Sequence, residues 1–115
     1  MQSLKTALMM ALFSAYLKAG CEHLFSQESA LKPLWQQVGD CADLTALARL
    51  AAKAWPCLPA SLPTSHRDLL HELRLISEMP QPLDEPTEYG RLTALPNVIW
   101  VEEWIEGLKP LSEGA

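Results

Sequence analysis

The sequence predicts an all-α fold: a small bundle of four to five helices with proline-rich connectors. Alanine and leucine dominate, glycine occurs only five times, and β-branched residues are sparse before the last twenty positions, a balance that favours helices. Apolar residues also recur at helical spacing in several segments, and prolines fall between these segments. With 115 residues, 49% of them hydrophobic and 20% charged, the chain is expected to form one domain around a single core.

The N-terminal segment predicts a helix that is apolar on nearly all sides. Apolar residues run from Leu4 to Phe25 with no turn signal before Ser26. Gly20 is the only weak helix former, at a cost of about 1 kcal/mol relative to alanine. A helix that is apolar all round belongs in the centre of a bundle or at a subunit interface. We therefore expect Leu8 and Leu12 to contribute to a contact with a partner.

The same segment resembles the signal of a bacterial lipoprotein. Lys5 supplies a thin basic start, Thr6 to Leu17 is uncharged, and Ala19-Gly20-Cys21 is similar to a lipobox. Lys18, however, stands where that motif has an aliphatic residue, and the apolar run is shorter than the ~20 residues that cross a bilayer. We favour a buried helix in a cytoplasmic protein. The alternative is an envelope assembly (pilot-type) lipoprotein, processed before Cys21 and anchored to the membrane through it.

Three further helices are expected in the first two thirds of the chain. One begins near Lys32 or Pro33, because proline is tolerated mainly in a first turn. The second is expected to be capped by Asp40, with Asp43 three residues on as in a capping box, and the third ends before Pro80. Residues 1–79 are thus predicted to form a helical core domain.

The last third of the chain has a different composition. Residues 80–96 are predicted to be a proline-rich acidic linker, and residues 97–115 an acidic amphipathic segment that packs on the core or on a partner. Apolar residues at helical spacing favour a helix in this segment. A short strand over residues 98–101 is the alternative, although Glu102 and Glu103 break its alternation.

The net charge of −5 lies wholly in the C-terminal part. Residues 1–78 contain seven basic and seven acidic residues, whereas residues 79–115 contain seven acidic and two basic ones. Binding to nucleic acid depends on clustered lysine and arginine, so this distribution argues against a nucleic-acid partner. An acidic end suits solubility or a basic partner protein.

The sequence indicates no catalytic site, no metal site and no cofactor. The candidate metal ligands are Cys21, Cys41 and Cys57 with His23, His66 and His71. Cys21 and His23 are two residues apart and point to different sides of a helix, and His66 and His71 lie about 140° apart around a helix axis. A disulfide from Cys41 to Cys57 would have to span about 21 Å if the residues between them are helical. Three unpaired thiols are typical of a reducing compartment.

The four tryptophans are the positive sign of a binding surface. Trp100 and Trp104 lie four residues apart on the acidic C-terminal segment, as aromatic anchors of a helix that binds in a groove do. The alternative is that Trp104 covers the core and Trp100 lies beside it. The residues expected to bind a partner are Trp100, Val101, Trp104, Ile105, Leu108 and Glu103, together with Leu8 and Leu12.

The function expected from this pattern is that of a non-enzymatic protein–protein interaction module. An anti-activator, an adaptor or a chaperone-like regulatory subunit would act by burying the apolar surface of a partner protein or of a second copy. We expect no small-molecule substrate and no membrane span. An enzyme with an unrecognised site is a third possibility, which the lack of any convergent polar cluster disfavours.

Overall fold

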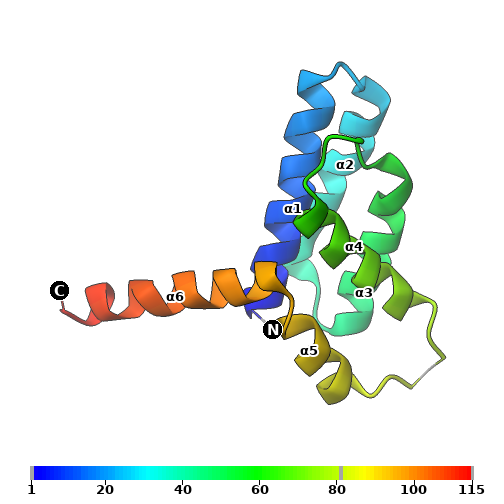
Figure 1. Cartoon of the computed structure of the whole chain (residues 1–115). Coiled ribbons are helices and arrows are strands. Elements are labelled where there is room, and N and C mark those ends of the chain that lie inside the picture. Colours follow the sequence, from blue (N-terminus) through cyan, green and yellow to red (C-terminus); the bar gives the residue numbers. More distant parts are fainter. Residues whose placement is uncertain (1, 81, 115) are drawn as a thin grey trace.

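The computed structural model describes residues 2–80 and 82–114, with side chains described as far as residue 107. All regular structure within these residues is helical, as predicted, but six α-helices form rather than four or five (Figure 1). The α-helices are α1 (Gln2–Cys21), α2 (Phe25–Gln37), α3 (Leu44–Ala54), α4 (Thr64–Ser77), α5 (Glu85–Thr93) and α6 (Pro96–Gly114). Two short 3₁₀ turns, η1 (Val38–Asp40) and η2 (Trp55–Cys57), follow α2 and α3.

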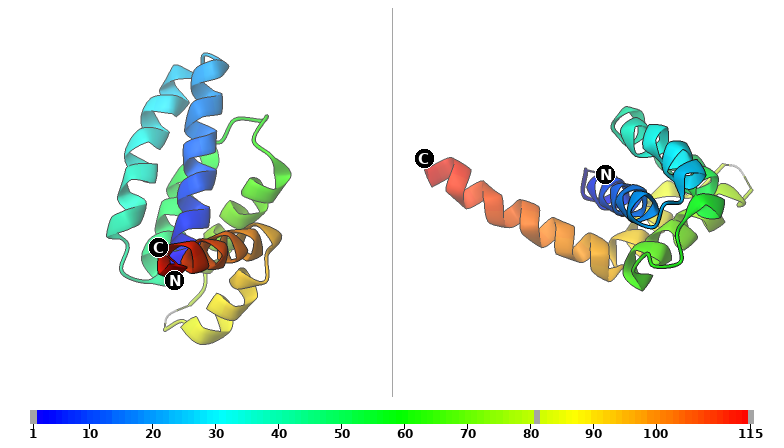
Figure 2. Two further views of the ribbon diagram at one scale, coloured as in Figure 1. Left: turned by 90° about the vertical axis from the view of Figure 1, so that its left-hand side faces the viewer. Right: turned by 90° about the horizontal axis from the view of Figure 1, so that it is seen from above.

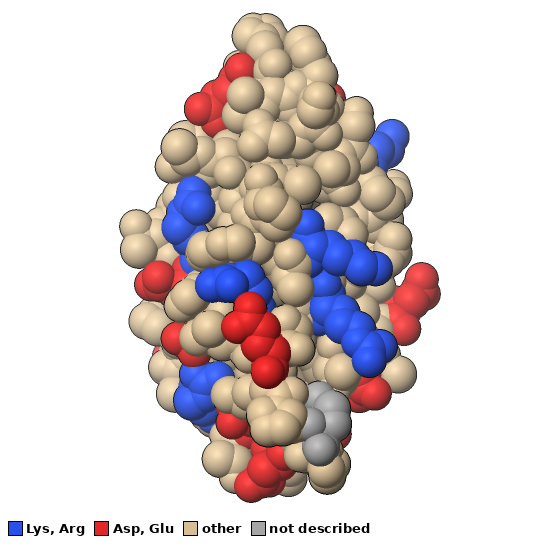
Figure 3. Space-filling view, turned by 90° about the vertical axis from the view of Figure 1, so that its right-hand side faces the viewer, with Lys and Arg blue, Asp and Glu red and all other residues tan. Residues whose placement is uncertain are grey.

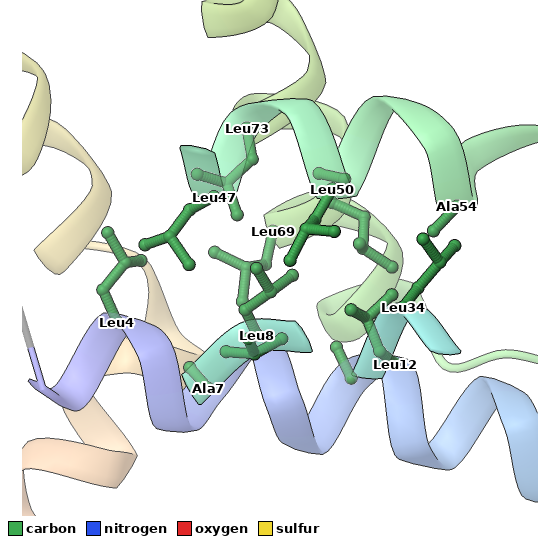
Figure 4. Close-up of a cluster of buried hydrophobic side chains, with 14 of the residues drawn as sticks. Leu4, Ala7, Leu8, Leu12, Leu34, Leu47, Leu50, Ala54, Leu69 and Leu73 are labelled. Carbon is green, nitrogen blue, oxygen red and sulfur yellow. The ribbon is translucent and has the colours of Figure 1, made fainter. Parts of the chain in front are cut away.

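The core lies between α1 on one side and α3 and α4 on the other, with α2 packed along α1. Leu8 of α1 points toward Leu47 of α3 and Leu69 of α4, and all three are fully buried (Figure 4). Ala11, Ala15 and Ala19 continue the buried side of α1, where their small side chains let neighbouring helices approach closely. α1 is therefore a core helix along one side of its length.

α2 begins earlier than the sequence predicts. We expected a start near Lys32 or Pro33, but the helix starts at Phe25 and contains Pro33 in its interior. The proline ring removes the backbone hydrogen bond to the carbonyl of Ser29. Pro33 and Ser29 are both exposed, so water can reach that carbonyl, and Leu31 and Leu34 bury the opposite side. Tertiary packing thus outweighs the local cost of the proline.

α5 occupies the segment that we expected to be a linker. That prediction is wrong for residues 85–93, because two tertiary contacts hold the segment in a helix. Arg91 bonds to Glu72 of α4 and, at 3.0 Å, to Glu88 of its own helix. The Glu85 carboxylate accepts a hydrogen bond from the backbone N–H of Leu44 at 3.3 Å, at the start of α3. Leu92 of α5 is fully buried.

α6 leaves the bundle. Its first turns cross the N-terminal end of α1, and the rest of the helix extends away from the other helices (Figures 1 and 2). The helix prediction for residues 97–105 is confirmed, and the strand alternative is wrong. The radius of gyration of 14.6 Å exceeds the ~13 Å expected for a compact domain of this length, in line with the projecting helix.

Candidate protein-binding surface

The outer face of α1 is apolar and exposed to solvent. Met10, Phe13 and Leu17 follow each other at i, i+3 and i+7, so they share one face of the helix, and Met9 borders them. These four side chains are 38–49% exposed. The helices α2, α3 and α4 lie on the other sides of α1 and do not cover this face (Figure 1). The helix α1, which is apolar on all sides, therefore lies at the edge of the bundle and exposes one apolar side.

One border of this face is held in place by aromatic contacts. The ring of Phe13 meets Trp35 of α2 edge to face, with 5.0 Å between ring centroids. Tyr16 approaches both rings, at 6.1 Å from each. These contacts orient the ring of Phe13, which remains 40% exposed.

α6 carries a second exposed apolar feature, the pair Trp100 and Trp104. The two rings are nearly parallel, with an interplanar angle of 2° and 6.4 Å between centroids. Both are about half exposed, at 54% and 50%. Val98 and Val101 of the same helix are buried against the bundle, so the core determines which way the tryptophans point.

The two features meet where α6 crosses α1. Met10 of α1 and Trp100 of α6 line the same hollow of about 270 Å³, together with Ala7, Asn97, Val101 and His66 of α4. The projecting helix and the outer face of α1 thus border one surface around this hollow, and the two helices form an L (Figure 1). We call this surface the apolar corner and define it as Met9, Met10, Phe13, Leu17, Trp100 and Trp104.

His66 at the edge of the corner is held in its neutral form. Burial lowers the pKa of its imidazole from the ordinary value, and the nearby charge of Lys18 lowers it further. Its Nδ1 atom is buried and has no hydrogen-bond partner among the described residues. Because the ring is uncharged at neutral pH, the hollow keeps its apolar character.

Charged side chains occur beside the tryptophans and on the side of the molecule that is turned away from α6. Glu102 accepts a hydrogen bond from the Ser3 hydroxyl at 3.1 Å and so ties α6 to α1, whereas Glu103 is exposed beside the tryptophans. The side of the molecule turned away from α6 shows basic and acidic side chains interspersed (Figure 3). Arg74 of α4 forms an ion pair with Glu78 at 3.4 Å. The apolar corner and the charged face are thus separate.

Some of the residues that we expected to bind a partner are exposed, and others are buried within this chain. Trp100, Trp104 and Glu103 are exposed at the corner, while Val101 is buried and Ile105 packs against the core. Leu8 and Leu12 are the clear correction, because both are fully buried inside this chain and offer nothing to a partner. The side chain of Leu108 lies outside the described residues.

The four α1 residues of the corner were not among the residues predicted from the sequence to bind a partner. The signal that could have found them was the apolar character of this helix on all sides. One side of such a helix faces its own core, so apolar residues on the other side require a second contact.

The remaining chemistry-bearing residues give no catalytic arrangement among the described residues. No group of three or more histidine, cysteine or acidic side chains gathers there in a way that could hold a metal ion. Cys41 is buried, and its Sγ lies 3.6 Å from the Gln37 carbonyl. Burial raises the pKa of its thiol, which disfavours the nucleophilic thiolate. Cys21, at the end of α1, is exposed. None of the helices within the described residues has the length and apolar character needed to cross a bilayer.

No protein family, no curated protein and no solved structure matches this chain. The function is therefore argued from the surface itself.

Proposed function

We propose that this protein is a non-enzymatic protein–protein interaction module that binds through the apolar corner. The observation that carries the proposal is that six large apolar side chains, 38–54% exposed, lie on two helices that cross, and that Met10 and Trp100 line one hollow at the crossing. At about 200 Å² per large side chain, they expose roughly 500 Å² of surface. That is near the upper end for the largest apolar patch of a typical monomer, and such patches often mark binding sites.

The composition of the corner suits protein binding. Tryptophan and methionine are enriched at interfaces, and binding energy concentrates in a few aromatic anchors. The stacked ring pair is held by α6, so little conformational entropy is lost when it binds. An anti-activator, an adaptor or a chaperone-like regulatory subunit would use such a surface to cover an apolar segment of its target. Three free cysteines favour the cytoplasm as its location.

The lipoprotein alternative conflicts with the packing of α1. Cleavage before Cys21 would remove eight buried residues of this helix. Leu4, Leu8 and Leu12, which face α3 and α4 in the core, are among them. A remnant that begins at Cys21 would expose the apolar sides of α2, α3 and α4. We therefore propose that the chain acts with α1 in place.

Site-specific photo-crosslinking in cells tests the proposed function. A photoreactive phenylalanine analogue is placed at Met10 or at Trp104 of the full chain, and at Phe25 as the control. Phe25 is the most exposed of the large apolar side chains, at 60%, and lies at the opposite end of α1 from the crossing with α6. We expect protein adducts from positions 10 and 104 and none from position 25.

The same experiment can contradict the proposal. Adducts of equal yield from all three positions would mean that contact follows exposure alone. The absence of adducts from positions 10 and 104 would show that the corner has no protein partner. Mass spectrometry of the adducts then identifies what was bound.

A further inference from the structure

We infer that a second copy of this chain occupies the apolar corner, with α6 of each copy lying against the outer face of α1 of the other. This inference rests on the proposed function and names the partner. It predicts a dimer with two-fold symmetry in which the same contact, α1 with the partner's α6, is made twice.

Charge complementarity between the two helices is the first argument. The helix α1 contains Lys5 and Lys18 and no acidic residue, whereas α6 as far as residue 107 contains three glutamates and no basic residue. Contact between α6 and its own copy would bring acidic residues together. Contact between α6 and α1 pairs unlike charges, which favours this arrangement over the alternatives.

Lys18 and Glu103 are the side chains best placed to pair across the interface. Lys18 follows Leu17 of the corner on α1, and its charge acts on the imidazole of His66, which lines the hollow. Glu103 is exposed one residue before Trp104. Lys5 is less available, because its ammonium group donates a hydrogen bond to the Gly39 carbonyl at 3.0 Å.

The shape of the molecule is the second argument. The helix α6 extends from the crossing on the side that the outer face of α1 looks toward (Figures 1 and 2). Each copy thus offers one projecting helix and one uncovered helix face. In a two-fold dimer, the α6 of each copy covers the outer face of α1 of the other, so the assembly is closed. Contact with one foreign helix would leave either α1 or α6 uncovered.

The exposed area is the third argument. A stable interface buries about 800 Å² on each partner. The corner supplies roughly 500 Å² of apolar surface, on the basis of about 200 Å² per large side chain. Exposed polar neighbours such as Gln2 and Glu103 extend this area at the rim.

Sedimentation equilibrium of the full chain, with a charge-swap series, tests the inference. The wild type is expected to have about twice the monomer mass of 12.8 kDa. Lys18→Glu and Glu103→Lys are each expected to weaken dimerisation roughly tenfold, and the double variant to recover most of the loss. Arg49→Glu, an equal charge reversal at an exposed site on α3, is the control and should not change the dissociation constant. Circular dichroism verifies that each variant keeps its helicity.

A mixed-isotope crosslinking experiment provides a second measurement that needs no charge variant. Unlabelled chain carrying the photoreactive residue at position 104 is mixed with ¹⁵N-labelled wild type. Trypsin releases Thr6–Lys18, which holds all four α1 residues of the corner. The inference predicts an adduct between position 104 and the labelled form of this peptide.

Two results would overturn the inference. One is a wild type that remains monomeric at about 100 μM, a concentration at which even weak dimers associate. The other is a double variant that dimerises no better than the single variants. A monomer whose positions 10 and 104 still crosslink to another protein in cells would refute the dimer and leave the proposed function standing.

Discussion

Leu8→Ala is expected to lower the free energy of unfolding by about 2–5 kcal/mol. Leu8 is fully buried at the centre of α1, where it faces side chains of both α3 and α4 (Figure 4). Removal of its methyl groups loses transfer free energy and leaves a cavity that the surrounding helices can fill only in part. Urea denaturation followed by circular dichroism measures the change.

Leu17→Ala is the matched control for this variant. It makes the same substitution on the same helix, but Leu17 is 49% exposed on the outer face. Its free energy of unfolding should change by no more than about 0.5 kcal/mol, the range for surface substitutions. Equal destabilisation by the two variants would mean that the outer face of α1 is part of this chain's own core, which would contradict the corner as a binding surface.

Trp104→Ala is expected to weaken association through the corner roughly 30-fold. An interface anchor contributes about 2 kcal/mol or more, and each 1.4 kcal/mol changes a dissociation constant tenfold. The side chain is half exposed, and its stacking contact is with Trp100 of the same helix. Helicity and the free energy of unfolding should therefore change little. Sedimentation equilibrium and urea denaturation measure the two effects separately.

Trp55→Ala is the control for Trp104→Ala. Trp55 is partly buried in the bundle, with the Arg74 guanidinium 4.8 Å from its ring centroid and His71 beside it. This substitution should reduce stability and leave association unchanged. If Trp104→Ala instead destabilises the fold as much as Trp55→Ala while association is unaffected, Trp104 is a packing residue and not an anchor.

Much of the fold followed from local signals in the sequence. The clearest case is α3, although its cap is Asp43, which accepts from the Ala46 N–H at 2.9 Å, and not Asp40 as expected. Pro56 and Pro80 follow the ends of α3 and α4, whereas Pro33 and Pro110 stand inside α2 and α6. The C-terminal helix followed from its apolar spacing.

The missed elements depend on contacts between distant residues. The segment around Glu85 looked like a linker because its proline and acidic residues disfavour structure locally. Its helix is held by Arg91 with Glu72, nineteen residues apart, and by Glu85 with Leu44, forty-one residues apart. No local pattern reports such contacts.

The candidate site was predicted only in part for a similar reason. The spacing of Trp100 and Trp104 left open whether Trp104 covers the core, and both side chains are about half exposed in the structure. On α1, however, Leu8 and Met10 are alike in hydrophobicity, and only the placement of α3 and α4 decides that Leu8 is buried while Met10 is exposed. The sequence indicated that this helix has two apolar sides but not which side faces the core.

The central claim is that α1 serves both as a core helix and as part of a binding surface in the working protein. The intact mass of the protein purified from whole cells, with membranes included, tests this claim most directly. A mass that includes residues 2–20 is predicted, because eight of these residues are buried in the fold. A mass that corresponds to a chain starting at Cys21 with attached lipid would contradict the account and assign the protein to the envelope.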